Sequence, residues 1–204
     1  MKSKNKLLII GAGGHARSCI DVIEQNKKFE IVGLIDKRKD FKKIYKYSIL
    51  GNDEKIKKLS KTIKYAIVCV GQIKSAQIRE NLYKKLKREG FRIPVIISPF
   101  AYVSPRAKIG EGTMIMHGAV VNTDVVIGKN CIINTNSVIE HEVKIGNHCH
   151  VSTGSILNGN VTLGNKSFLG SGSVIREKIK IGDNCIVGAN TFLKKNLISN
   201  SIFK

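Results

Sequence analysis

The stretch VVIGKN-CIINTN-SVIEHE-VKIGNH-CHVSTG, residues 125–154, decides the fold, because it divides into hexads that each carry an aliphatic residue in third place. The same division runs without a gap from Val95 to Asn196, and the third place of all seventeen hexads is Ile, Val or Leu. A period of six with one compulsory aliphatic side chain predicts a short strand and a corner in each hexad. We therefore expect a β-solenoid whose inward side chains form one continuous core.

The residues that close the hexads predict the corners of this solenoid. Gly, Asn and Asp often stand in sixth place, and they tolerate the left-handed backbone that tight corners require. Three hexads make one triangular coil, so the seventeen hexads make between five and six coils. Neighbouring coils are expected about 4.8 Å apart, as paired strands are, so residues in the same place of successive coils should lie side by side.

The first 94 residues follow a different pattern, in which apolar strands alternate with amphipathic helices. The expected strands are LLIIG, EIVGLID and YAIVCVG, and a basic loop follows the second of them. The expected helices are HARSCIDVIEQNKK, DEKIKKLSK and SAQIRENLYKKLKREG, the last ending at Gly90. This alternation predicts a small parallel sheet of the βαβ kind. We expect two domains: a Rossmann-like α/β domain in residues 1–94 and the solenoid in residues 95–204.

Composition argues against several classes of protein. The net charge is +20, but the lysines are scattered along helical stretches, which favours attraction of phosphorylated small molecules over nucleic-acid binding. The five cysteines show no CxxC spacing and lie in apolar stretches, which predicts buried, reduced thiols. No apolar run approaches the ~20 residues of a membrane span, and the run after the charged start is too short for a signal peptide. A cytoplasmic protein is expected.

One part of the repeat, SVIEHEVKIGNHCHVS, departs from bland polar corners. A carboxylate beside a histidine orients the ring and raises its basicity, so His141 with Glu142 could form a general base. His141 stands in fifth place and should point outward. The residue one coil further on is Gly159, whose missing side chain would leave room for an extended ligand along the solenoid. A solvated surface patch is the alternative interpretation.

The other histidines of the repeat suggest less chemistry. His148, Cys149 and His150 alternate across a strand, so they cannot converge on one ion, and no metal site is expected. Cys149 is expected to face the core. His117 has no acid beside it in the sequence and is interpreted as structural or interfacial.

The first expected strand-to-helix turn, IIGAGGHARS, suggests a second site. Its glycines let the backbone approach a phosphate at a helix N-terminus, and it satisfies G-x-G-x-x-A with Asp36 at about the distance of a ribose-binding acid. The domain lacks a second mononucleotide half, so a single nucleotide diphosphate fits better than NAD. Val70, Gly71 and Gln72 end the next long strand, where ligands of such sheets gather.

Taken together, the GAGGHAR turn, the α/β domain, the hexapeptide repeat and the xIEHExxIGxxxHVSxG stretch resemble the NeuD/PglD-type sugar acetyltransferases over nearly the whole chain. The resemblance implies a left-handed parallel β-helix, which breaks the right-handed crossover preference. It also implies acetyl-CoA as donor and a homotrimer with active sites between adjacent β-helices. Members N-acetylate UDP-4-amino sugars or related nucleotide amino sugars, or O-acetylate sialic acid.

The resemblance assigns roles to particular residues. His141 would deprotonate the attacking amine, Glu142 would raise its basicity, and His150 would hydrogen-bond the thioester region of acetyl-CoA. The remaining matches fall in two groups: an acetyl-CoA groove with Gly159, Ser171 and Ala189, and a nucleotide-sugar pocket with Gly13, Gly14, His15, Asp36, Lys37 and Gly71.

The sequence therefore predicts an acetyl-CoA-dependent N-acetyltransferase of a nucleotide-linked amino sugar, expected to be a UDP sugar, in bacterial surface glycan biosynthesis. Sialic-acid-type O-acetylation is the alternative reaction. Two departures from the family pattern stand out: the chain ends LKKNLISNSIFK without a G-x-P-A-K-like loop that helps hold coenzyme A, and Lys37 stands where some members have a second acid. The first departure leaves a non-catalytic scaffold or nucleotide-sugar sensor as an alternative of another class.

Overall fold

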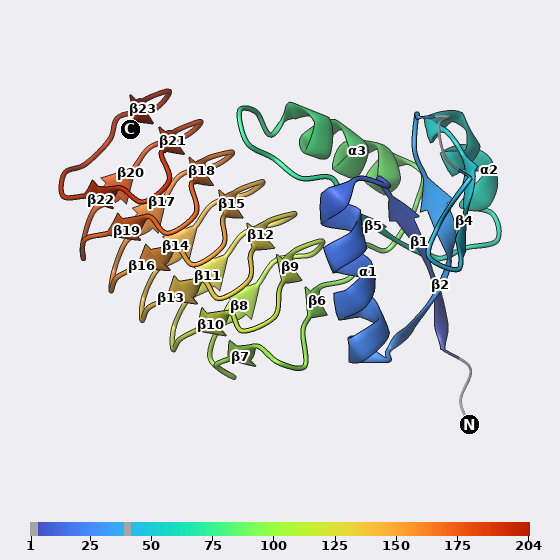
Figure 1. The fold of residues 1–204 in the computed structure, drawn as a ribbon, viewed down its shortest axis with the longest axis horizontal. Helices are drawn as coiled ribbons and strands as arrows, with labels where there is room; N and C mark the ends of the chain where they lie inside the picture. Colours follow the sequence, from blue (N-terminus) through green and yellow to red (C-terminus); the bar gives the residue numbers. More distant parts are fainter. Residues whose placement is uncertain (1–3, 39–41) are drawn as a thin grey trace.

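A computed structural model describes residues 4–38 and 42–204 of the chain. The N-terminal part contains a five-stranded sheet (Figure 1). Its strands are β1 (Asn5–Ile10), β2 (Phe29–Ile35), β3 (Lys43–Ile44), β4 (Tyr47–Gly51) and β5 (Tyr65–Val68), in the order β3-β4-β2-β1-β5. The pairs β2–β4, β1–β2 and β1–β5 are parallel, as predicted, and β3 runs antiparallel to β4.

The helices of this part are α1 (Gly14–Asn26), the 3-10 turn η1 (Asp53–Lys55), α2 (Ile56–Leu59) and α3 (Gln77–Arg88). The first and third predicted helices are confirmed, and Gly90 follows α3 with a φ of +83°. The second is shorter than expected, because a 3-10 turn takes up its first residues. The predicted basic loop was wrong in part: it holds the β3–β4 hairpin, although residues 39–41 lie outside the described part.

The solenoid consists of two-residue strands that form three faces, each a sheet of parallel strands. From β6 to β22 each strand contains the second and third residues of a hexad. The seven-stranded face contains β6 (Ile96–Ile97), β9 (Met114–Ile115), β12 (Ile132–Ile133), β15 (His150–Val151), β18 (Phe168–Leu169), β21 (Ile186–Val187) and β23 (Ile202–Phe203). The six-stranded face contains β7 (Tyr102–Val103), β10 (Val120–Val121), β13 (Val138–Ile139), β16 (Ile156–Leu157), β19 (Val174–Ile175) and β22 (Phe192–Leu193). The five-stranded face contains β8 (Lys108–Ile109), β11 (Val126–Ile127), β14 (Lys144–Ile145), β17 (Thr162–Leu163) and β20 (Lys180–Ile181).

The core and the corners of the solenoid follow the hexad rule. From Ile115 to Leu193 the third-place aliphatic side chains are buried in one continuous cluster, to which Cys131, Cys149 and Cys185 also belong. Every sixth-place residue from Gly112 to Asn190 has a positive φ, as predicted for the corners. From β6 to β22 the strands pair with partners three hexads away, so a side chain on one coil lies directly beside its counterpart on the next.

The solenoid continues past Asn196, where the sequence repeat ends. Leu197 bridges Ile181 and β23 pairs with β21, so both pairings are two residues closer in the sequence than a full coil of three hexads. The step from Leu193 to the next inward residue, Leu197, is thus shortened by two residues. Leu197 and Phe203 still pack against the core, but the slipped register hides them from a search with period six.

The α/β part packs against the seven-stranded face. Ile20 and Ile23 of α1 share a core cluster with Ile96, Met114 and Met116. His117 joins the parts through Asp21 of α1, with its Nε2 2.9 Å from a carboxylate oxygen, which agrees with its predicted interfacial role although the acid comes from elsewhere in the chain. The division at residues 94 and 95 stays a prediction. Within residues 4–38 and 42–204 no helix is long and apolar enough to cross a membrane.

Candidate active site

His141 and Glu142 stand at the corner that follows β13, between the six- and five-stranded faces. The side chains are 55% and 58% exposed, so His141 points outward as predicted. Its Nδ1 lies 3.2 Å from Oε2 of Glu142. Because a carboxylate only accepts hydrogen bonds, Nδ1 carries a proton, and in the neutral ring the lone pair is on Nε2. The pair therefore has the geometry of a general base oriented by an acid.

Gly159 lies beside His141 on the next coil, where the imidazole ring covers it. A Cβ on Gly159 would stand 2.6 Å from both Cε1 and Nε2 of His141. In this structure the ring occupies the space left by the missing side chain, and the ligand contact expected at Gly159 stays a prediction. Any side chain at this position would displace the ring, so Gly159 fixes where the base of the pair lies.

His150 has the opposite environment on the seven-stranded face, where it is only 7% exposed. Its Nδ1 lies 2.7 Å from the carbonyl oxygen of Gln72 and therefore donates to it, which leaves Nε2 as an acceptor 3.2 Å from Nδ2 of Asn134. Burial lowers the pKa of His150 to about 3, although the bond to Gln72 opposes the shift. His150 is thus neutral at physiological pH, and its single acceptor lone pair, on Nε2, faces the amide of Asn134 in the cleft.

An open cleft of about 750 Å³ lies around His150, between the α/β part and the solenoid. It brings together Gly14, His15 and Gly71, predicted to bind the nucleotide sugar, and His150, predicted to bind the donor. Three further residues of the solenoid line the cleft and were not predicted: Asn134, Thr135 and Thr153. Two of them could have been found from the repeat, because Thr135 and Thr153 precede Ser171 and Ala189 in one corner column, one residue per coil.

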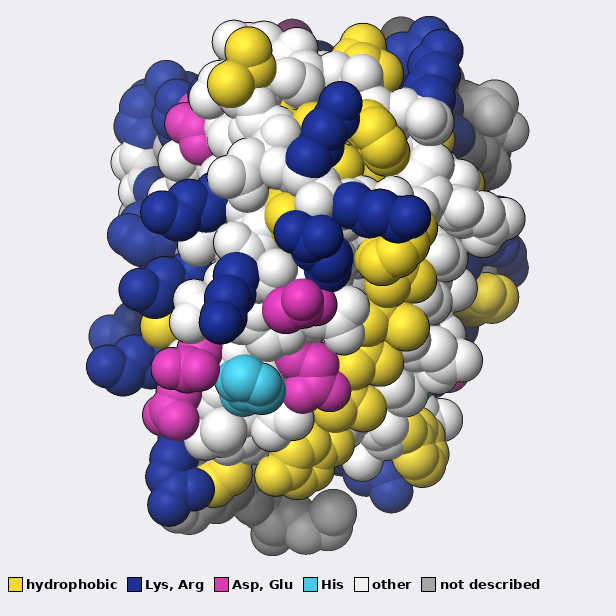
Figure 2. All heavy atoms as spheres, turned by 90° about the vertical axis from the view of Figure 1, so that its left-hand side faces the viewer, with side chains coloured by type: hydrophobic (Ala, Val, Ile, Leu, Met, Phe, Trp, Pro, Cys, Tyr) yellow, Lys and Arg dark blue, Asp and Glu magenta, His cyan; other side chains and the backbone are white. Residues whose placement is uncertain are grey.

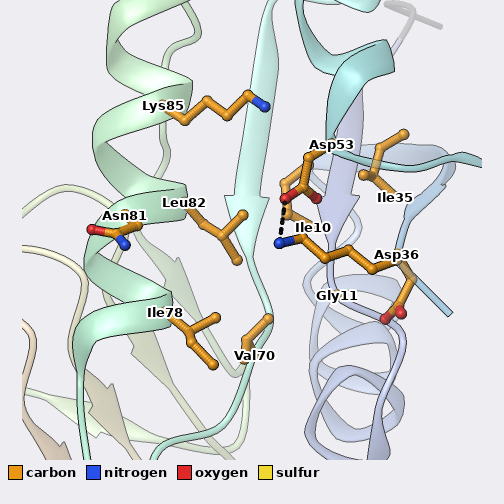
Figure 3. Close-up of a pocket in the computed structure, with 11 residues that line it drawn as sticks. Ile10, Gly11, Ile35, Asp36, Asp53, Val70, Ile78, Asn81, Leu82 and Lys85 are labelled. Carbon is orange, nitrogen blue, oxygen red and sulfur yellow. Dashed lines mark ion pairs between the residues drawn. The ribbon is translucent and has the colours of Figure 1, made fainter.

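A second cavity of about 320 Å³ lies between α3 and the carboxyl ends of β1, β2 and β5 (Figure 3). It is lined by Asp36 and Lys37, both predicted to bind the nucleotide sugar, and by Gly11 of the glycine turn. Ile78 of α3 lines this cavity and the cleft around His150. The two spaces therefore adjoin along the strand ends.

Asp36 holds the glycine turn between these two spaces. It accepts hydrogen bonds from the backbone of Ala12 at 2.6 Å and from Nε of Arg38 at 3.0 Å. Partial burial raises the pKa of Asp36, but the hydrogen bonds from Arg38 and the backbone outweigh burial and lower it below its ordinary value. Gly11 needs to be glycine, because its φ is +103° and a Cβ would stand 2.6 Å from the Val70 side chain. Gly14 has open space above it.

Comparison with known proteins identifies the family. Residues 6–86 match the model of the PglD N-terminal domain, and residues 92–204 match that of the GMPPB C-terminal domain. The perosamine N-acetyltransferase PerB from Caulobacter crescentus, solved in complex with CoA and GDP-perosamine, is 29% identical with a TM-score of 0.91, over 98% of this chain and 94% of that one. This chain belongs to the NeuD/PglD-type sugar acetyltransferases. Its solenoid is accordingly the left-handed β-helix that the sequence analysis expected.

Other members of the family and fold agree with this assignment. The acetyltransferase domain of PglB from Neisseria gonorrhoeae in complex with acetyl coenzyme A is 29% identical with a TM-score of 0.90, over 96% of this chain and 94% of that one. WeeI from Acinetobacter baumannii, at 21% identity and a TM-score of 0.84 over 98% and 96% of the chains, shares the fold. This NeuD/PglD-type chain is thus a sugar N-acetyltransferase.

The acetyltransferase does not bring all its predicted site residues together within one chain. His141 and Gly159 occupy the corner between the six- and five-stranded faces, whereas His150 lies on the seven-stranded face, on the other side of the triangular coil. Ser171 and Ala189 occupy the corner between the seven- and six-stranded faces, away from Gly159 of the same chain, and the predicted acetyl-CoA groove stays a prediction. Ser171 instead meets Ser152, with the two hydroxyl oxygens 3.0 Å apart.

A buried polar network behind His150 escaped the sequence analysis of this acetyltransferase. Arg79 of α3 is 1% exposed and donates to Oε1 of Gln72 at 2.8 Å and to the carbonyl oxygen of Asn130. Gln72 also donates to the carbonyl oxygen of Lys166 at 3.2 Å, and its own carbonyl holds His150. The network thus fixes the segment that orients His150. Nothing in the sequence distinguishes Arg79 from the exposed basic residues of the same helix.

Proposed function

We propose that this acetyltransferase moves the acetyl group of acetyl-CoA to the amine of a nucleotide-linked amino sugar, as a step in surface glycan biosynthesis. The observation that carries the proposal is the pair of adjoining spaces, the cavity under α3 and the cleft around His150, which share Ile78 and are both lined by the glycine turn. A nucleotide diphosphate sugar has this form: a flat base, two phosphates and a sugar at the far end. Ile78 of α3 lines both spaces and therefore lies where they meet.

The glycine turn suits the diphosphate. Gly13 caps the 13-residue helix α1 without a side chain, and among the described residues no neighbour outside the helix backbone lies within 4 Å of where a Cβ on Gly14 would stand. Helix N-termini attract phosphates through their backbone N–H groups and the helix dipole. His15, Gly71 and Lys74 line the cleft immediately beyond, where the amino sugar would begin.

The reaction would be direct transfer without an acyl-enzyme. The sugar nitrogen attacks the thioester carbon, the C–S bond breaks, and its electron pair leaves on the sulfur of coenzyme A. Nε2 of His141 takes the proton that the nitrogen loses and returns it to the departing thiolate. Glu142 stabilises the imidazolium that forms in between. Neutral His150 would accept a hydrogen bond from an N–H near the thioester, which would replace the amide of Asn134 at its Nε2.

A second copy of the chain would complete the site. The outer positions of the six-stranded face are all apolar and run the length of the solenoid: Tyr102, Val120, Val138, Ile156, Val174 and Phe192. Figure 2 shows a continuous line of hydrophobic side chains running past a surface histidine flanked by acidic side chains. The corresponding positions of the five-stranded face include Lys108, Lys144 and Lys180. An apolar surface of this length favours burial against another copy of the chain, whereas the lysine-bearing five-stranded face can remain in water.

Closed rotational symmetry would bring the two histidines together. If the six-stranded faces surround a common axis, one edge of each face meets the opposite edge of the next copy's face. One edge carries His141, and the other carries Thr135 and Thr153 beside the cleft of His150. The homotrimer expected from the family resemblance has this arrangement, with each active site between adjacent copies.

The test is release of free thiol from acetyl-CoA with GDP-linked amino sugars, UDP-linked amino sugars and free sialic acid offered in parallel. We expect turnover with one nucleotide amino sugar and none without an acceptor. Turnover of sialic acid alone would replace N-acetylation by O-acetylation. If no acceptor is turned over while nucleotide sugars still bind, the protein is a sensor or scaffold and the proposal fails.

A further inference from the structure

Asp53 has no role in the chemistry described above, yet its carboxylate lies in the cavity under α3. It belongs to η1, its side chain is 19% exposed, and Figure 3 shows its carboxylate directed into the space between α3 and the strand ends. The other walls of the cavity are mainly aliphatic: Ile10, Ile35 and Val70 from the strands, and Ile78 and Leu82 from α3. A carboxylate in such a slot needs hydrogen-bond donors from whatever fills it.

The partner that Asp53 has in this structure is weak. Nζ of Lys37 lies 3.5 Å from Oδ2 of Asp53, and the Lys37 side chain is 80% exposed. An ion pair with so exposed a lysine contributes little to stability, because water screens it and the long side chain loses freedom. A ligand that offers better-placed donors would displace Lys37 at small cost.

Two apolar walls and the weakly paired Asp53 carboxylate describe a slot for a flat ring with donors on its edge. The other carboxylate of the lining, Asp36, is already held by Ala12 and Arg38. Ile78 is 66% exposed, which is unusual for a large aliphatic side chain beside a cavity, and a ring inserted in the slot would cover it. The volume of about 320 Å³ lies in the range of small-ligand pockets. On the α3 side, Figure 3 shows the Lys85 side chain extending from the helix toward the sheet, and its ammonium could donate to an acceptor on the same ring.

We propose that this cavity binds guanine and that Asp53 selects it, so that the substrate is a GDP-linked amino sugar. The inference rests on the proposed function and names its nucleotide. Among the nucleobases guanine alone carries two adjacent donors, the ring N1–H and the 2-amino group, which match the two oxygens of one carboxylate. Uracil offers one N–H between two carbonyl oxygens, and a carboxylate facing that edge repels at least one of them. The uridine nucleotide expected from the family resemblance is therefore the poorer fit.

The experiment measures the affinities of GDP and UDP by isothermal titration calorimetry for the wild-type protein, Asp53→Asn and Glu54→Gln. Glu54 is the matched control: it is the next residue of η1, loses the same charge, and pairs with Asn52 rather than lining the cavity under α3. We expect the wild type to prefer GDP by about tenfold to a hundredfold, the discrimination of a bidentate base contact. An asparagine in place of Asp53 presents one donor and one acceptor, which suits uracil.

Asp53→Asn should therefore lose most of the GDP affinity and keep or improve the UDP affinity, while Glu54→Gln keeps the wild-type ratio. Unchanged CoA affinity in both variants would show that they fold. Equal or tighter UDP binding by the wild type overturns the inference, and so does an unchanged ratio in Asp53→Asn. If the wild type binds UDP more tightly than GDP and still releases thiol with a UDP-linked amino sugar, the assignment of guanine is wrong but the proposed acetyl transfer stands. If no nucleotide binds and no acceptor is turned over, the proposed function fails with it.

Discussion

The two histidines of this acetyltransferase lie in opposite environments. His141 stands on an exposed corner with one carboxylate partner, and its ring rests on a glycine of the next coil. His150 is buried between the solenoid and the α/β part, and the Gln72 carbonyl fixes its proton on Nδ1. They are close neighbours in the sequence, yet they belong to different sides of the coil. The difference teaches that neighbouring motif residues in a solenoid can serve different sites on one chain.

The contrast also assigns them different chemistry. A base must change its protonation state during turnover, and solvent access at His141 allows that. Burial of His150 lowers its pKa to about 3, so it stays neutral and contributes a fixed hydrogen bond instead. Substitutions at the two positions should therefore differ in size and kind.

Replacing His141 should give the largest effect. His141→Ala removes the general base, so kcat should fall by about 10²–10⁴-fold while the chain stays folded and assembled. The control is Glu177→Ala, in the same corner column two coils from His141, which should keep wild-type activity. Activity of His141→Ala within a few-fold of the wild type would contradict the assignment. Thiol release measures both.

Separating the copies should have the next largest effect, because His141 and His150 would then belong to no common site. Ile156→Glu places a charge in the apolar column of the six-stranded face, and activity per chain should fall by about tenfold or more with loss of the oligomer. Thr162→Glu changes the next face of the same coil, between Lys144 and Lys180, and should alter neither. Light scattering and thiol release test the pair, and an active monomer would refute the shared site.

Mixing two inactive variants should then restore part of the activity. If each site takes His141 from one copy and His150 from the next, randomly mixed His141→Ala and His150→Ala chains should form intact sites at about a quarter of positions. Refolding the variants together and apart, then measuring thiol release, tests this. Mixed samples no more active than the separate ones would mean that both histidines act within one chain.

The smallest effect concerns stability and pH. Burial lowers the pKa of His148 to about 4 and that of His150 to about 3, so the unfolded chain takes up protons first as the pH falls. The stability that the neutral rings provide is complete above about pH 6.5 and decreases below it, by up to about 1.4 kcal/mol per pH unit for each histidine. Urea unfolding at several pH values measures this slope. His148→Asn should reduce it, and an unchanged slope would contradict the assignment.

Local structure could be predicted from the sequence wherever a residue type at a given place of the repeat adopts one conformation or one environment. The third-place aliphatic residues, the positive φ of sixth-place residues such as Asn136, and the outward His141 all follow from the period alone. The β3–β4 hairpin could not be predicted, because β3 has only two residues and the turn at Tyr45 and Lys46 contains no glycine, asparagine or aspartate. The last turn also escaped, because the register slips by two residues before Leu197.

The sequence by itself determined the solenoid, the parallel sheet before it and the histidine–glutamate pair, because these depend on periodicity and on neighbours along the chain. Tertiary structure decided which of the motif residues meet. It joined His150 to Gly71 and Gln72, placed His141 on another side of the coil, and turned Asp53 into the cavity under α3. Contacts of this kind arise from packing between segments far apart in the chain, and no local pattern records them.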